Sequence, residues 1–351
     1  MSNFQRIGAI YPTLAEACAV VGIAVPRALK GRYTAIQAED DRRGKAAGRV
    51  YQFPDGRGCA VMNWKTGVMA VVVYGWIPGQ HIDRRELARL KAEAERARAA
   101  EWAREQACRK KAAAVARSIV EASRPYLGDD VHGYLRLKQI AFAAPSLLEI
   151  GKEKAQALIA AGGIDSPPQG LRQLKSARLL VAPLVTKQGV SSVQLIDEYG
   201  TKTFLRGASV RGAVWCPHEK PVCPQVIGIA EGVATALSVT RLYGVPCVAA
   251  MSAGNLSAAA RTVCALFPSS LLAFYADRDP SGIGSDKAQA AWLELGADRR
   301  SGSPMTPGIY IPRFNAGDYE TFKQIKKSAG AVPTDFNDLL ALQAHNGVIT
   351  P

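Results

Sequence analysis

The stretch LLAFYADRDPSG, residues 271–282, places two aspartates directly after a short apolar run. The apolar run is typical of a buried strand, and Asp277 and Asp279 follow at the point where that strand would end. Residues i and i+2 of an extended segment face the same side, so both carboxylates can point at one place. Taken alone, the pair could equally be a turn in which Asp279 caps a helix. The interpretation therefore depends on the surrounding sequence.

The residues on either side of this stretch alternate between apolar runs and helix candidates. The apolar runs are QVIGIA (225–230), VPCVAAM (245–251), LLAFYA (271–276) and GIYIP (308–312). The segments between them have apolar residues at helical spacing. Strands that alternate with helices in this way indicate βαβ units and a parallel sheet. Active sites in such sheets form at the carboxyl ends of the strands.

Further carboxylates are expected at the same edge of this sheet. Glu231 follows the first apolar run directly, and PTDFNDLL places Asp335 and Asp338 around a helix start. Clustered carboxylates repel one another unless a cation lies among them, and hard oxygen ligands suit Mg²⁺ or Mn²⁺. Two such ions can clamp the attacking and leaving oxygens of a phosphoryl transfer. The sequence therefore predicts a metal site at Glu231, Asp277 and Asp279, with Asp335 and Asp338 as further candidate ligands.

The motifs IAEGVATALSV, FYADRDPSG and PTDFNDLL resemble those of the Toprim domain, which bacterial primases, topoisomerases, recombination mediators and some nucleases share. The resemblance implies that Glu231 is a general acid/base or a metal ligand, and that Asp277 and Asp279 are metal ligands. These three residues are the candidate catalytic residues.

Residues 177–215 resemble the subdomain that precedes Toprim in bacterial-type primases, where a basic surface follows the template strand. This resemblance implies that basic side chains contact template phosphates, and the candidates are Lys187, Lys202, Arg206 and Arg211. Each of them could instead be an ordinary solvated side chain. Residues before 80 resemble the N-terminal module of plasmid-borne, conjugation-associated primase-like proteins, although no zinc ribbon is visible among them.

The whole chain is expected to be α/β plus α+β, in four parts. These are a small β-rich module (1–80), a long basic helical linker (81–126), a mixed primase-like subdomain (127–223) and a Toprim domain with a parallel sheet flanked by helices (224–351). We expect an antiparallel meander within 49–74, and one long helix or two stacked helices over 83–124, which contain no Gly or Pro. Residues 128–165 are expected to be helical, and strands are expected at 177–185, 190–197 and 201–205.

Composition favours a partner with many negative charges. The formal net charge is +14 and the pI is about 9.6, which suits DNA, RNA or nucleotides. No apolar run is long enough to span a membrane, and residues 1–6 lack the apolar run of a signal peptide, so we expect a cytoplasmic protein. Seven scattered cysteines argue against a disulfide framework. Cys216, His218 and Cys223 could hold a metal, but their spacing fits no standard zinc pattern.

The leading hypothesis is a primase of plasmid or phage type, which makes short RNA primers on single-stranded DNA. Its cofactor would be Mg²⁺ or Mn²⁺, its substrates ribonucleoside triphosphates, and a replicative helicase is a further candidate partner. Two alternatives remain open. One is a Toprim nuclease that uses the same carboxylates, and the other is a non-enzymatic single-stranded-DNA-binding protein with a vestigial site.

Overall fold

The computed structural model describes residues 10–29, 33–39, 41, 46–53, 55–77, 84–164, 169–217, 224–278, 282–302 and 308–348. Asp279 of the predicted metal site, and His218 and Cys223 of the cysteine cluster, lie outside these ranges. The chain forms two compact units, residues 1–105 and 106–351. Within the described ranges, no helix is both long enough and apolar enough to cross a membrane.

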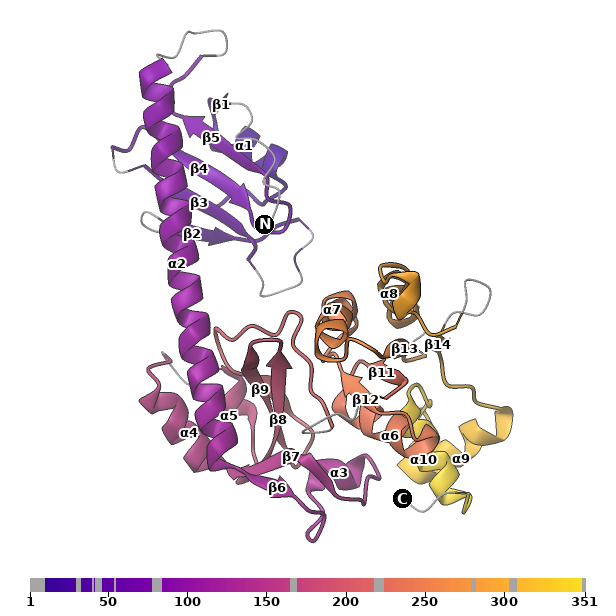
Figure 1. Ribbon diagram of the computed structural model, residues 1–351. Helices are drawn as coiled ribbons and strands as arrows, with labels where there is room; N and C mark the ends of the chain where they lie inside the picture. The colour runs from indigo at the N-terminus through magenta and orange to yellow at the C-terminus, as the bar shows by residue number, and fades with distance from the viewer. Residues whose placement is uncertain are drawn as a thin grey trace. The chain divides into compact units, whose positions relative to one another are not determined.

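The first unit contains a five-stranded sheet in the order β1-β5-β4-β3-β2 (Figure 1). Its strands are β1 (Ile10–Tyr11), β2 (Tyr33–Ile36), β3 (Gly48–Gln52), β4 (Gly58–Asn63) and β5 (Met69–Val73). Strands β3, β4 and β5 pair antiparallel in sequence order, which confirms the predicted meander. Helix α1 (Leu14–Val21) packs on this sheet through Ala17, Cys18 and Val21. It begins at Thr13, whose hydroxyl accepts the Glu16 N–H, and ends at Gly22 in the left-handed conformation.

Helix α2 (Arg84–Ala122) is one continuous helix of 39 residues, so the single-helix alternative is correct. Its last turns carry small and branched apolar side chains on one face. Ala112, Val115, Ala116 and Ile119 of this face are buried in a core with strands of the second unit. This end of the helix is therefore held by apolar burial.

The first half of the second unit is a five-stranded antiparallel sheet in the order β10-β9-β8-β7-β6. Its strands are β6 (Arg124–Tyr126), β7 (Ala144–Gly151), β8 (Arg178–Thr186), β9 (Gly189–Asp197) and β10 (Lys202–Phe204). The accompanying helices are α3 (Gly133–Leu137), α4 (Lys152–Ala161) and α5 (Gln169–Gln173). The last three strands confirm the predictions for 177–185, 190–197 and 201–205.

The expectation that 128–165 is helical throughout is wrong for residues 144–151. This segment, APSLLEIG, is strand β7, which pairs with both β6 and β8. Leu147 is buried in one core and Ile150 in another, on opposite faces of the sheet. A short apolar run that is buried on both faces has no period by which a strand can be distinguished from a helix, so the pairing decides.

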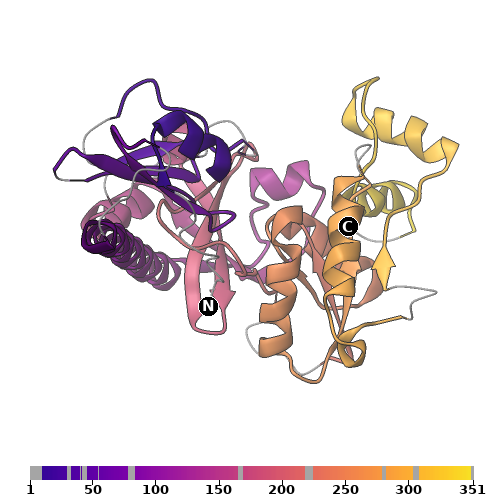
Figure 2. The same ribbon diagram turned by 90° about the horizontal axis from the view of Figure 1, so that it is seen from above.

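The second half of this unit is a four-stranded parallel sheet, which confirms the predicted parallel sheet, and its strand order is β12-β11-β13-β14. Its elements in chain order are β11 (Val226–Ala230), α6 (Val233–Tyr243), β12 (Cys247–Ala249), α7 (Leu256–Leu266), β13 (Leu271–Tyr275), α8 (Ile283–Leu293), β14 (Ile309–Tyr310), α9 (Ala316–Lys326) and α10 (Phe336–His345). Helix α6 packs on one face of the sheet, and α7 and α8 pack on the other (Figures 1 and 2). Because crossovers are right-handed, this division of the helices follows from the reversal of strand order at β11.

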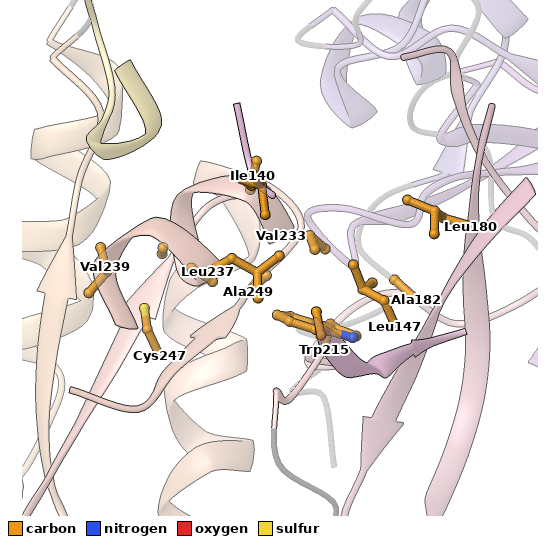
Figure 3. Close-up of a cluster of buried hydrophobic side chains, with 14 of the residues drawn as sticks. Ile140, Leu147, Leu180, Ala182, Trp215, Val233, Leu237, Val239, Cys247 and Ala249 are labelled. Carbon is orange, nitrogen blue, oxygen red and sulfur yellow. The ribbon is translucent and has the colours of Figure 1, made fainter. Parts of the chain in front are cut away.

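One apolar core joins the two sheets of the second unit around Trp215 (Figure 3). The indole is fully buried, and its Nε1–H donates to the Ser146 carbonyl at 3.2 Å. The Trp215 backbone pairs with Ala249 of β12, while the neighbouring Val214 pairs with Val185 of β8. Residues 214 and 215 therefore connect both sheets. Trp215 is a packing residue, and its ring has no exposed face on which a nucleic-acid base could stack.

Replacement of Trp215 by Ala should lower the free energy of unfolding of the second unit by about 3–5 kcal/mol, because it removes a large side chain from a core that cannot fully close. Urea unfolding followed by circular dichroism measures this loss. The matched control is Tyr199→Ala, since Tyr199 is 69% exposed, and it should change stability by less than about 0.5 kcal/mol. Equal effects of the two substitutions would contradict the assignment of Trp215 to the core.

Candidate metal centre

In the parallel sheet, the chain connections that leave the adjacent strands β11 and β13 run in opposite directions. Strand β11 continues through α6 to β12 on one side, and β13 lies on its other side. Crevices for ligands form at such a switch point, at the carboxyl ends of the strands. In the register, Ala230 is opposite Tyr275, so Glu231 is the first residue after β11 and Asp277 the second residue after the adjacent β13. The structure thus brings together these two predicted site residues.

The Asp277 carboxyl at this edge has a strongly raised pKa. Burial, together with the negative charges of Asp335 and Glu231 and against the opposing effect of Lys138, raises its pKa from 3.8 to about 7. Its Oδ1 is buried and has no hydrogen-bond partner within the described part of the chain. A buried carboxylate oxygen without a donor is costly, and a cation would remove that cost.

Aromatic packing behind Asp277 positions the helix that carries Asp335. The Tyr275 ring stacks on Tyr310 of β14 at 5.1 Å and meets Phe336 edge-on at 5.3 Å. Gly228 of β11 makes room for this ring, because a Cβ there would lie 2.9 Å from a Tyr275 ring atom. Phe336 is the first residue of α10, so its burial fixes the start of α10 beside the strand end.

Asp335 and Asp338 form a reciprocal cap at the start of α10. The Asp338 N–H donates to Asp335 Oδ1 at 2.8 Å, and Asp338 Oδ2 accepts the backbone N–H groups of Thr334 and Asp335 at 2.8 and 3.4 Å. Burial and the neighbouring Asp335 raise the pKa of Asp338. Both carboxyl groups therefore use an oxygen to cap the helix, and Asp335 Oδ2 is the oxygen that faces a cation, Lys138, at 3.9 Å.

Asn337 and Lys138 attach α3 to this acidic edge. The Asn337 amide is buried and donates to the Lys138 carbonyl at 2.7 Å and to the Ser238 hydroxyl at 3.1 Å. Lys138, at the end of α3, is thereby held where its ammonium balances Asp335 and lowers the pKa of Asp277. Neither residue was predicted from the sequence. The available signal for Asn337 was its position as a polar residue between the two acids of DFND.

Lys202 lies at the acidic edge, as the structure places the start of β10 against α3. Its ammonium is 4.8 Å from the centre of the Tyr134 ring. Much of the side chain is exposed, yet burial around the ammonium lowers the pKa of Lys202, and Asp335 opposes this shift. The Lys202 charge therefore acts on the acidic cluster through Asp335.

Lys187, Arg206 and Arg211 are exposed on turns. Strand β10 runs from Lys202, opposite Ile196, to Phe204, opposite Gln194, so Arg206 lies further along, in the direction of the β8–β9 turn that carries Lys187. Lys187 and Arg206 are thus separated from Lys202 along the antiparallel sheet.

Asn255 holds the turn that carries Arg211. Its side-chain amide donates to the carbonyls of Val210, Ala213 and Ala250 at 2.8–3.2 Å and accepts the Gly212 N–H at 2.7 Å. This buried side chain ties the segment after β10 to the start of α7. The turn is therefore fixed to the parallel sheet, and the Arg211 side chain projects from a rigid base.

The residues of this edge fit a divalent cation. Among the described residues, which do not include Asp279, no three His, Cys, Asp or Glu side chains form a ready-made cage. Nevertheless, an unpartnered buried carboxylate oxygen, two strand ends with carboxylates and a third carboxylate from α10 provide hard oxygen donors in one place. Such donors suit Mg²⁺ or Mn²⁺.

Comparison with known families agrees with the fold and the position of this edge. Residues 226–345 match the family model described as the Toprim domain, and this part of the chain is a Toprim domain. The matched residues run from the start of β11 to the end of α10, so they include Glu231, Asp277, Asp335 and Asp338.

Three solved structures are similar to this chain at low sequence identity and with low TM-scores. The primase fragment of the bacteriophage T7 primase-helicase protein is 16% identical, with 49% of this chain and 59% of that chain covered and a TM-score of 0.32. A DNA primase domain from Pseudomonas aeruginosa is 13% identical, with 56% and 59% covered and a TM-score of 0.33. The DnaG primase catalytic domain bound to ssDNA is 11% identical, with 69% and 79% covered and a TM-score of 0.40. The chain thus spans little more than half of the first two, and TM-scores below 0.5 support no statement about activity.

The raised pKa of Asp277 predicts how stability depends on pH without metal. The folded pKa of about 7 lies above the unfolded value, so the associated stability is present at acidic pH and lost as the pH rises through about 7. In chelator, wild-type protein should lose about 1–3 kcal/mol between about pH 4 and pH 8 that Asp277→Asn does not lose, a range reduced from the full shift because the site is partly solvated. Urea unfolding at each pH measures the difference.

The control for this pH series is Asp129→Asn, since Asp129 is exposed on a loop. It should follow the wild-type curve. Added Mg²⁺ should restore the stability of the wild type at pH 8 and leave Asp277→Asn unchanged. Parallel pH curves for wild type and Asp277→Asn would show that Asp277 ionises normally, and would contradict the raised pKa of its carboxyl.

Proposed function

We propose that this protein is a Toprim-type primase, which joins ribonucleotides into short primers on single-stranded DNA by Mg²⁺-dependent nucleotidyl transfer. The observation that supports it best is the half-buried Asp277 carboxyl at the switch point of a Toprim domain, with Glu231 and Asp335 close enough to raise its pKa. Such a site is suited to a divalent cation that binds the phosphate groups of a nucleotide.

In this proposal, Asp277, Asp279 and Glu231 hold the metal, and Asp335 contributes its second oxygen. Asp338 is proposed as a further ligand, although one of its oxygens already serves the helix cap. When bound, Mg²⁺ would neutralise the charge that develops on the phosphate oxygens. Glu231 would either complete the ligand set or accept the proton of an attacking 3′-hydroxyl.

Lys202 and Lys138 provide positive charge directly beside these acids. Both ammonium groups act on Asp335 or Asp277, so a nucleotide placed at the carboxylates would have its phosphates within their field. Lys187, Arg206 and Arg211, on exposed turns of the same unit, would contact the template backbone. A net charge of +14 supports a nucleic-acid partner.

The wider context is proposed from the sequence resemblance alone. It favours a plasmid or phage origin, and it makes a replicative helicase a candidate partner in the cytoplasm.

A primer-synthesis assay tests the proposed function. Wild-type protein is incubated with circular single-stranded DNA, labelled ribonucleotides and Mg²⁺ or Mn²⁺, and products are resolved by size. Wild type should make short RNA that a DNA polymerase extends, and Asp277→Asn should reduce the rate by at least about 100-fold, since it removes a charged ligand. Asp129→Asn should retain full activity.

The remaining outcomes separate the alternatives. Strand cleavage without incorporation of nucleotides would replace the primase with a Toprim nuclease. Binding of single-stranded DNA with neither activity, unchanged by Asp277→Asn, would leave a binding protein with a vestigial site.

A further inference from the structure

A cavity lies at the strand end that carries Asp277 and Arg278. It has a volume of about 490 Å³ and is lined by Arg278, Ile309, Ile311, Pro312, Arg313 and Phe314. None of these described lining residues is an Asp or a Glu, so the cavity is distinct from the carboxylate cluster.

Among the described residues that line this cavity, all the charged side chains are positive. Its two ionisable residues are Arg278 and Arg313, and both side chains are exposed. In the part of the chain that the structure describes, neither guanidinium has an ion-pair partner at 4.0 Å or less, whereas Arg261 and Arg178 on the same unit pair with carboxylates. Two guanidinium groups without a carboxylate between them create a positive potential that favours an anion.

The backbone on both sides of the cavity is held in place. The Arg278 N–H donates to the Thr334 carbonyl at 2.7 Å, which ties the end of β13 to the segment that leads into α10. Arg313 and Phe314 follow β14 and precede α9, whose capping box joins Asn315 and Asp318. Phe314 also packs edge-on against Tyr319 of α9 at 6.3 Å. The two arginines thus project from fixed backbone, which reduces the entropy that binding would cost.

The cavity also offers an apolar wall. Ile309, Ile311 and Pro312 line it together with the ring of Phe314, and Ile311 is 41% exposed. An inorganic anion would use only the guanidinium groups, whereas a nucleotide would use both parts, its phosphates on the arginines and its base or sugar on the apolar wall.

We propose that the cavity of Arg278, Arg313 and Phe314 is a nucleotide-phosphate binding site, adjacent to the carboxylate edge and separate from it. The identity of the ligand as a nucleotide rests on the proposed function. The phosphates belong either to a free nucleoside triphosphate or to the backbone of a nucleic-acid strand, and the guanidinium groups would bind both through the same charge-assisted hydrogen bonds.

Binding measurements in chelator test this site without catalysis. The full chain and the variants Arg278→Gln and Arg313→Gln are titrated with inorganic tripolyphosphate, with ATP and with a labelled oligothymidylate, at low salt. The control is Arg261→Gln, because Arg261 is an exposed arginine on α7 that pairs with Glu294. Each cavity variant should bind at least one of the three probes about 10-fold more weakly than wild type, and Arg313→Lys should lose less than Arg313→Gln. Circular dichroism verifies that the variants fold.

Each outcome bears on the proposal. Loss confined to tripolyphosphate and ATP assigns the site to a free nucleotide, and loss confined to the oligothymidylate assigns it to a strand. Unchanged binding of all three probes in both cavity variants would overturn the site, as would an equal loss in Arg261→Gln, which would mean that only overall charge matters. Since no metal is present, a protein that makes no primers can still pass this test, and an active primase can fail it.

Discussion

Asp277 has a buried carboxylate oxygen at a strand end, next to other acids. Its negative charge is stable there only if positive charge lies nearby, and the contacts of the second unit place that charge. Asp277 cannot move away, because Tyr275 two residues before it is locked between Tyr310 and Phe336. The order of the parallel strands sets Glu231 beside it. Lys138 and Lys202, which lie on neighbouring elements, reduce the repulsion between these acids. A divalent cation would neutralise the remaining negative charge.

The positions of these charges depend on neutral contacts elsewhere. Asn337 fixes α3 and therefore Lys138, Asn255 fixes the turn of Arg211, and Trp215 joins the antiparallel and parallel sheets in one core. Each of these three side chains is buried, and each has its polar group paired with the protein. A site assembled from three chain segments can be precise only if such contacts hold the segments together.

The parallel sheet and the positions of Glu231 and Asp277 were predictable, because alternation of apolar runs with helices defines strand ends directly. Two kinds of feature were not. Strand β7 is buried on both faces, so its apolar run lacks a period. The roles of Lys138 and Asn337 arise from contacts between segments about 200 residues apart, such as the 2.7 Å bond from Asn337 to the Lys138 carbonyl, whose sequence separation is 199. Local patterns carry no information about such contacts.

The dual use of Asp335 and Asp338 was also beyond the sequence. DFND predicted a helix start and candidate ligands, and the structure shows that the helix cap occupies an oxygen of each acid. Asp277, with a buried oxygen that has no partner in the described ranges, is therefore the residue on which the metal centre depends most.

The most direct measurement is an anomalous difference map from crystals soaked in Mn²⁺. The account predicts a peak at the Asp277 and Glu231 carboxylates, which disappears in Asp277→Asn. A map without a peak at these carboxylates, or with Mn²⁺ bound only elsewhere on the chain, would contradict the central claim.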